Sequence, residues 1–138
     1  MKTRFLLLAL TLLFAPFAHA QDDADPPVQT QKPPEKLAPA VRDAFNLLMT
    51  SIQDDDYTGF LVGVDDNFKA ALTKKMFDTV VAQMAPRQKN GYEAIYLEQL
   101  KRGAYTVHLW KLAFQDGGDD ILAEMSLKDG KIGGFFLR

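Results

Sequence analysis

His108 is the side chain in this sequence that is best suited to proton transfer. It is one of two histidines, and the other, His19, lies in a segment that we expect to be removed. An imidazole titrates near neutral pH, so it can serve as a general acid or base. Tyr57 and Tyr96 could polarise a substrate carbonyl beside it. The alternative is a core or rim histidine whose hydrogen bonds are satisfied by neighbouring groups.

The orientation of His108 depends on the strand that carries it. Alternation divides this strand into one face with His108, Trp110, Leu112 and Phe114, and another with Tyr105, Val107, Leu109, Lys111 and Ala113. We expect the first face to meet the helices, because it has the larger apolar bulk. A slip of one residue would turn His108 outward.

Aromatic side chains along the chain are candidates for the lining of an apolar pocket. Small ligands are held by apolar walls with a few polar groups. The residues that we expect to bind such a ligand are Tyr57, Phe60, Phe68, Tyr96, His108, Trp110 and Phe114. Because no coherent catalytic set accompanies them, the first hypothesis is a non-enzymatic domain that binds a small apolar ligand or a protein partner. A purely structural dimer module with a filled core is another hypothesis.

The acidic run that starts at Asp54 offers one arrangement for a metal ion. If Asp54 opens a calcium-binding loop, oxygen ligands fall at its first, third, fifth and twelfth positions, with a glycine at the sixth. However, Asp65 at the twelfth position is shorter than the usual glutamate, and Val62 at the ninth cannot hold the usual water. An acidic turn that ends a helix explains the run without a metal. We therefore expect no metal, and we expect no cofactor either. If a metal ion were bound here, its candidate ligands would be Asp54, Asp56 and Asp65.

The first twenty residues have the layout of a secretory signal peptide. A basic start at Lys2 and Arg4 precedes an apolar run at residues 5–14, and residues 18–20 form a small-x-small cleavage site. The run is too short to cross a bilayer, which takes about 20 residues. We expect cleavage after Ala20 and export to the periplasm or the medium, with an uncleaved anchor as the alternative.

The chain that remains is mildly acidic and has no cysteine. Loss of Lys2 and Arg4 from the 16 basic residues leaves 14, against 18 acidic ones. Nucleic-acid binding is not expected, because phosphate contacts need clustered lysine and arginine. The lack of cysteine excludes disulfides and thiol chemistry. After signal cleavage, no apolar run is long enough to span a membrane.

Residues 21–39 favour a proline-rich, disordered linker. They include five prolines and almost no large apolar residue. Such a segment is a spacer or, alternatively, a docking motif for a partner. The folded domain is expected at residues 40–138.

Apolar residues of this domain recur first with a helical period and then with a period of two. Helical spacing covers residues 41–52 and 68–84, with a short apolar piece at 57–64, Thr73 as a candidate N-cap, and Pro86 and Asn90–Gly91 as the expected end of the helical half. Four strands are predicted at Tyr92–Leu100, Ala104–Phe114, Asp120–Leu127 and Lys131–Leu137. Their short, glycine-containing links permit only hairpins. The fold class is therefore α+β, with N-terminal helices packed on a curved, four-stranded antiparallel meander.

The face of the second strand that points away from the helices is also apolar. Val107 and Leu109 on this face indicate a second covered surface, since a wet sheet face is usually more polar. The simplest explanation is a homodimer through the outer face of the sheet. A partly apolar exposed face is the alternative.

The order of these elements resembles a known superfamily. A Phe- and Leu-rich first helix, an Asp-Asp-Tyr break at residues 55–57 and a terminal strand pair at Ser126–Leu137 are similar to the nuclear-transport-factor-2-like superfamily of cystatin-like cones. Within it, the resemblance is greatest to bacterial secreted domains of unknown function, and it covers Ala40–Arg138.

This resemblance implies a cone-shaped roll with a pocket between helices and sheet, and frequent homodimers through the outer sheet face. Members include isomerases and dehydratases as well as binding domains, so it also implies an alternative in which His108 is the acid or base of such an enzyme. The steroid-isomerase type of site uses a tyrosine and two carboxylic acids, and this set does not map onto the chain. Function must therefore be argued from the site.

Overall fold

The structure is a computed structural model that describes residues 36–138. The predicted signal peptide (1–20) and residues 21–35 of the predicted linker lie outside the described residues. Residues 36–38 belong to no helix or strand, and Leu37 packs against the hydrophobic core. No helix within residues 36–138 is long and apolar enough to cross a membrane.

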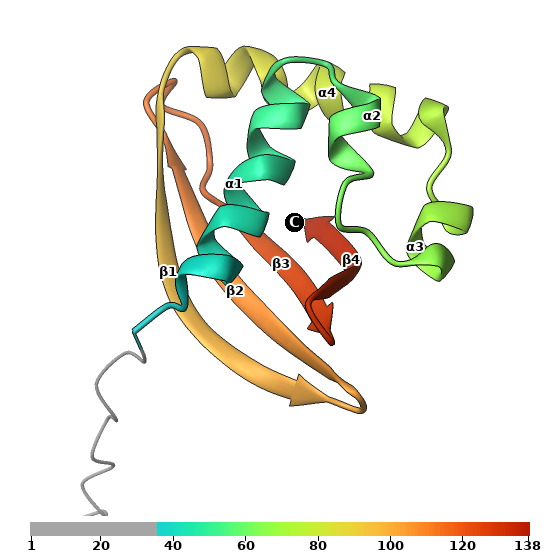
Figure 1. Ribbon diagram of the computed structural model, residues 1–138. Coiled ribbons are helices and arrows are strands. Elements are labelled where there is room, and N and C mark those ends of the chain that lie inside the picture. Colours follow the sequence, from blue (N-terminus) through green and yellow to red (C-terminus); the bar gives the residue numbers. More distant parts are fainter. Residues whose placement is uncertain (1–35) are drawn as a thin grey trace, which may run out of the picture. The chain divides into compact units, whose positions relative to one another are not determined.

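Four helices precede four strands in the described part of the chain (Figure 1). The helices are α1 (Pro39–Gln53), α2 (Tyr57–Phe60), α3 (Asp66–Ala71) and α4 (Lys74–Lys89). The strands are β1 (Tyr92–Arg102), β2 (Tyr105–Phe114), β3 (Ile121–Lys128) and β4 (Lys131–Leu137). The predicted α+β class is confirmed.

Side chains in the links determine where the later helices begin. Asp56 and Asp65 each accept a hydrogen bond of 2.8 Å from the backbone N–H three residues ahead, at the starts of α2 and α3. Thr73 caps α4 in the same way, as the sequence predicts. These oxygens satisfy backbone donors that have no partner in the first turn of a helix.

The helical half ends at Asn90–Gly91 as predicted, but Pro86, which was predicted to end it as well, does not. It lies inside α4, which continues to Lys89 and has Asn90 as its C-cap residue. Proline lacks an N–H and weakens the helix around it, but tertiary contacts hold the last turn in place. The buried side chain of Gln88 donates from Nε2 to the carbonyl of Met49 in α1, at 2.9 Å. Packing against α1 therefore outweighs the local preference.

The strands form one antiparallel meander in the order β1-β2-β3-β4. The turn between β3 and β4 has positive φ at Asp129 and Gly130, 50° and 73°, which is typical of a tight hairpin. In β1, a bulge at Leu97 interrupts the pairing with β2 between Tyr96 and Glu98. Residues beyond a bulge lie on the face opposite to that which strict alternation predicts.

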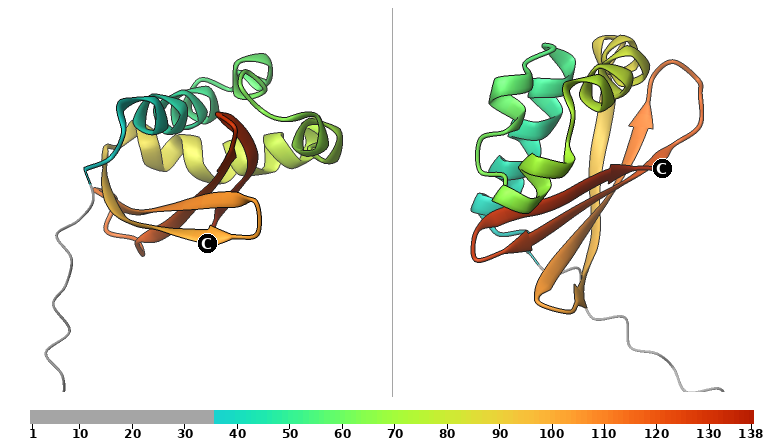
Figure 2. Two further views of the ribbon diagram at one scale, coloured as in Figure 1. Left: turned by 60° about the horizontal axis from the view of Figure 1, so that its bottom comes forward. Right: turned by 90° about the vertical axis from the view of Figure 1, so that its right-hand side faces the viewer.

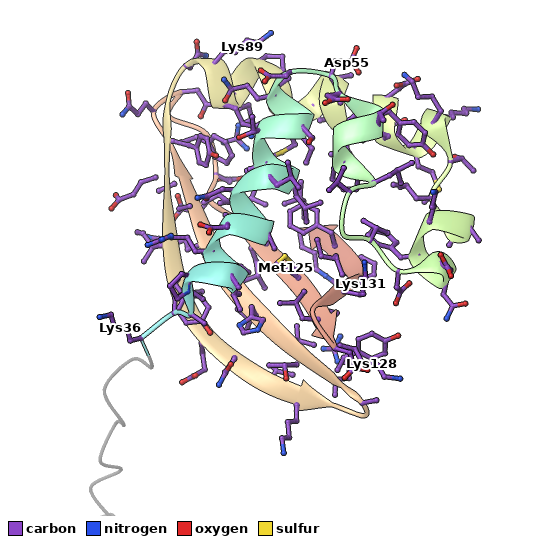
Figure 3. All side chains as sticks on the ribbon, in the orientation of Figure 1. Lys36, Asp55, Lys89, Met125, Lys128 and Lys131 are labelled. Carbon is purple, nitrogen blue, oxygen red and sulfur yellow. The ribbon has the colours of Figure 1, made fainter. Side chains whose placement is uncertain are left out.

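The helices cover one face of this sheet (Figure 2). Met125 of β3 is completely buried between α1 and the sheet (Figure 3). Close to it, Phe45 of α1 stacks on Trp110 of β2, with 4.0 Å between ring centroids and 13° between ring planes. This stacked pair fills the centre of the domain.

Candidate functional site

His108 lies on the inner face of β2, among side chains that meet the helices. It is 5% exposed, and Trp110 and Leu112 on the same face are also buried. The face predicted from alternation is therefore confirmed. Burial lowers the pKa of His108 below its ordinary value of 6.5, because poorly solvated surroundings disfavour the imidazolium form. At neutral pH the side chain is a neutral imidazole.

A tyrosine of the neighbouring strand binds the ring of His108. The hydroxyl of Tyr96 in β1 lies 3.1 Å from Nδ1 of His108. In a neutral imidazole, one ring nitrogen donates a hydrogen bond and the other accepts one. The hydroxyl suits either tautomer, since it donates to a bare Nδ1 or accepts from a protonated one.

A pocket of about 420 Å³ opens beside this pair, and we call it the histidine pocket. Its walls come from α1 with the segment before it, from β1 and β2, and from the β3–β4 hairpin. The lining residues are Lys36, Leu37, Ala38, Ala40, Val41, Ala44, Tyr96, Gln99, Thr106, His108, Leu127, Asp129 and Gly130. Figure 3 shows Lys36 just before the first turn of α1 and Lys128 on the hairpin, at the end of the domain where this pocket lies.

The two walls of the histidine pocket differ in chemistry. Leu37 and Val41 make the side of α1 apolar, whereas Gln99 and Thr106 add hydrogen-bonding groups to the imidazole on the sheet side. Such a pocket suits a small molecule with an apolar body and one or two polar groups.

The predicted pocket residues do not line a single pocket. Tyr96 and His108 line the histidine pocket, whereas Phe60 and Phe68 line a second hollow of about 490 Å³ between α3, α4 and β4. The stack of α1 on β2 fills the centre of the domain, where a single cone pocket would lie.

Three of the predicted pocket residues line neither of these hollows. Tyr57 donates from its hydroxyl to a backbone carbonyl in the α3–α4 link, at 3.0 Å. Trp110 is covered by Phe45. The ring of Phe114 lies under the guanidinium of Arg87, 3.9 Å from the ring centroid. These contacts are structural.

Sequence reasoning missed Gln99 and Thr106 in the lining. Strict alternation from Tyr96 turns Gln99 to the outer face, but the bulge at Leu97 brings it to the inner face, opposite His108. Nothing in the local sequence marks Leu97 as a bulge. Thr106 lies two residues before His108 in β2 and therefore on the same face. Alternation along this strand could have placed it in the lining.

The three acidic metal candidates all lie at helix ends. Asp54 is the C-cap residue of α1, and Asp56 and Asp65 are the N-cap residues of α2 and α3. Residues 36–138 contain no group of three or more His, Cys, Asp or Glu side chains that could hold a metal ion. Side-chain capping accounts for the positions of the carboxylates of Asp56 and Asp65.

Comparison with known proteins gives no assignment. No family model and no curated protein matches this chain. A similar solved structure is a crystal structure of a "putative polyketide cyclase" from Sinorhizobium meliloti. It is 15% identical, and the match covers 70% of this chain and 94% of that one, with a TM-score of 0.42. A likeness of this degree transfers no activity to the chain.

Proposed function

We propose that this protein is an exported domain of the nuclear-transport-factor-2-like type that binds a small molecule in the histidine pocket. The observation that carries this proposal is a pocket of about 420 Å³ whose wall contains the buried His108, hydrogen-bonded to the half-buried Tyr96. Small-ligand sites usually have volumes of roughly 300–1,000 Å³ and few polar groups. Export rests on the signal peptide that the sequence predicts.

The neutral state of His108 restricts the ligand. Because burial disfavours the imidazolium form, the imidazole offers one hydrogen bond and no charge. A carbonyl, hydroxyl or amide group suits this wall better than an anion does. Lys36 and Asp129 are the charged residues of the described lining, and because their charges are opposite they add no preference for an anion.

The test is native mass spectrometry of the exported protein, purified gently from its own cell fraction. We expect a retained small molecule in the wild type and its loss in Ala44→Leu, which fills the pocket without harming α1. The matched control is Ala82→Leu, on an exposed part of α4 that lines no hollow described here. Equal retention in both variants would contradict the proposal. The proposal would also be contradicted if the wild type retained no small molecule and its melting temperature did not shift with a panel of small compounds that have an apolar body and one or two polar groups.

An enzyme that uses His108 as acid or base is the second candidate. It is favoured by the hydrogen bond between Tyr96 and Nδ1, because a partner at one ring nitrogen orients the other for proton transfer. His108→Gln separates the two candidates, since glutamine keeps an uncharged polar group but cannot transfer a proton. Conversion of the retained molecule by the wild type and not by this variant would favour the enzyme. Retention by both without conversion would favour the binding domain.

We further propose a homodimer through the outer face of the sheet. Leu97 and Leu100 of β1 are each more than a third exposed, and Leu100 lies opposite Val107 on the outer face. Light scattering should give twice the chain mass for the wild type and the single mass for Leu100→Glu. A monomeric wild type at the concentration found in the cell would exclude this dimer.

A further inference from the structure

β4 is an edge strand whose free side is only partly paired. The sheet order places β3 on one side of β4 and no strand of residues 36–138 on the other. On this free side, the N–H of Ile132 donates to the carbonyl of Gly63 at 2.9 Å, and its carbonyl accepts from the N–H of Asp65 at 2.8 Å. Residues 63–65 therefore form a short parallel bridge with the start of the strand.

The remaining groups of this edge belong to Phe135 and Leu137. Arg138 and Leu122 exchange both backbone hydrogen bonds across the β3–β4 ladder, and the register is unbroken from Gly134 to Leu137. Bonded and non-bonded pairs alternate along an antiparallel ladder. The N–H and C=O groups of Phe135 and Leu137 therefore point away from β3, and within the described chain no backbone group binds them.

An apolar groove runs along this edge, and we call it the β4 groove. It consists of the hollow of about 490 Å³ and a smaller one of about 310 Å³. The two hollows share Phe68, Leu72, Met76 and Phe136, so they are neighbouring parts of one groove. One wall consists of β4 from residue 133 onward, and the other consists of α3 and α4. Figures 1 and 2 show where these elements lie in the domain.

We propose that the β4 groove binds an extended peptide segment of another protein, which adds to the sheet as a fifth strand. The backbone groups of Phe135 and Leu137 match the alternating N–H and C=O groups of an extended chain. In strand addition these bonds provide affinity, and pockets for alternate side chains provide specificity. The inward side chains of the segment lie on Leu72 and Met76, so the segment has apolar residues at alternate positions.

The shape of the groove favours a single strand over a second copy of this chain. β4 and the helices line it on opposite sides, so an occupant is confined on both flanks. In a second copy of this chain, β4 is flanked by its own β3 and α3. Together these elements are wider than one extended chain, so they fit the groove less well than a single strand does. Residues 63–65 already pair with this edge as a single extended segment, and the groove continues from that bridge.

The test uses a fluorescein-labelled octapeptide of alternating valine and threonine with a lysine at each end. In a strand, side-chain face and hydrogen-bonding edge alternate together, so all the valine N–H groups point to one edge and all the threonine N–H groups to the other. N-methylation of the valines or of the threonines therefore removes the donors of one edge only. By fluorescence anisotropy, we expect one methylated peptide to bind like the parent and the other at least tenfold more weakly. Equal loss in both, or no binding of the parent, would overturn the proposal.

Variants of the protein test the same bonds from the other side. Leu137→Pro removes an N–H that points away from β3, a position at which an edge strand tolerates proline. Leu137→Ala loses the same side chain and keeps this N–H, so it is the matched control. We expect binding of the parent peptide to be at least fivefold weaker in the proline variant than in the alanine variant.

A second pair of variants remains informative if the proline variant does not fold. Met76→Glu puts a charge on the groove wall, and Val62→Glu changes an equally exposed residue (54% and 55%) that lines neither hollow. Peptide binding should weaken in the first and stay unchanged in the second. Equal binding in both would overturn the proposal. So would a dimer that Met76→Glu dissolves while no peptide binds, which would assign the groove to a second copy. The histidine pocket has no part in this result.

Discussion

At the scale of single residues, the buried imidazole of His108 couples stability to pH. The pKa of His108 in the folded chain lies below 6.5, the ordinary value that applies to the unfolded chain. At pH values between the folded and the unfolded pKa, the unfolded chain therefore binds more protons than the folded one. Stability therefore falls as the pH drops through this window. We expect the loss of unfolding free energy between pH 7.5 and pH 5.5 to be smaller in His108→Gln than in the wild type. Urea titrations at several pH values measure it, and parallel pH profiles would contradict it.

A second residue-scale prediction concerns Gly133, which allows Tyr105 to pack on the backbone of β4. A Cβ at this position would lie 2.3 Å from Cε1 of Tyr105, so the ring would have to move. We expect Gly133→Ala to lower the unfolding free energy by about 1–3 kcal/mol, the usual range for overpacking. Gly134→Ala is the control, because its Cβ meets the half-exposed ring of Phe136 at 3.2 Å and otherwise only Ser126 Oγ, at an ordinary contact distance of 3.9 Å. Equal melting temperatures for the two variants would show that the contact with Tyr105 is unimportant.

At the scale of elements, the start of α4 depends on one side chain. Thr73 accepts a hydrogen bond from a first-turn N–H at 3.2 Å, and loss of such a cap costs about 0.5–2 kcal/mol. Thr79, inside the same helix, donates only to the carbonyl of Lys75. Chemical denaturation should therefore show destabilisation in Thr73→Ala and none in Thr79→Ala, since alanine is the better helix former. Similar losses in both would mean that the cap contributes nothing.

The elements were predictable where the signal is local. Alternation with a period of two, together with the glycine-containing turns, predicted four strands and placed His108 on the inner face of the sheet. The cap residue Thr73 predicted the start of α4. Pro86 misled because the contact of Gln88 with α1 is not visible in the sequence of α4. The lining of the histidine pocket was only partly predictable, because the bulge at Leu97 reverses the face of Gln99 without a sequence signal.

At the scale of the whole domain, one stacked pair separates the histidine pocket from the β4 groove. Phe45 contacts Trp110 at 4.0 Å and Phe135, which lines the β4 groove, at 6.2 Å between centroids. Its neighbour Ala44 lines the histidine pocket, so Phe45 lies between this pocket and the β4 groove. The aromatic content alone predicted a single pocket, because it does not reveal which rings pack on one another. The two sites that we propose, one for a small molecule and one for a peptide, are separate because this centre is filled.

Removal of the Phe45 ring tests this separation. Phe45 is 2% exposed, and Phe→Ala at such a site costs about 3–5 kcal/mol. Trp110 is the single tryptophan of the chain, so its emission reports on this position. In Phe45→Ala we expect a lower unfolding free energy and, in the folded variant, a red-shifted emission, because the opened centre connects to the histidine pocket and admits water. Phe136→Ala, which removes a half-exposed ring, should leave the emission unchanged. An unshifted emission in folded Phe45→Ala would mean that the neighbouring side chains close the gap and that other contacts keep the two sites apart.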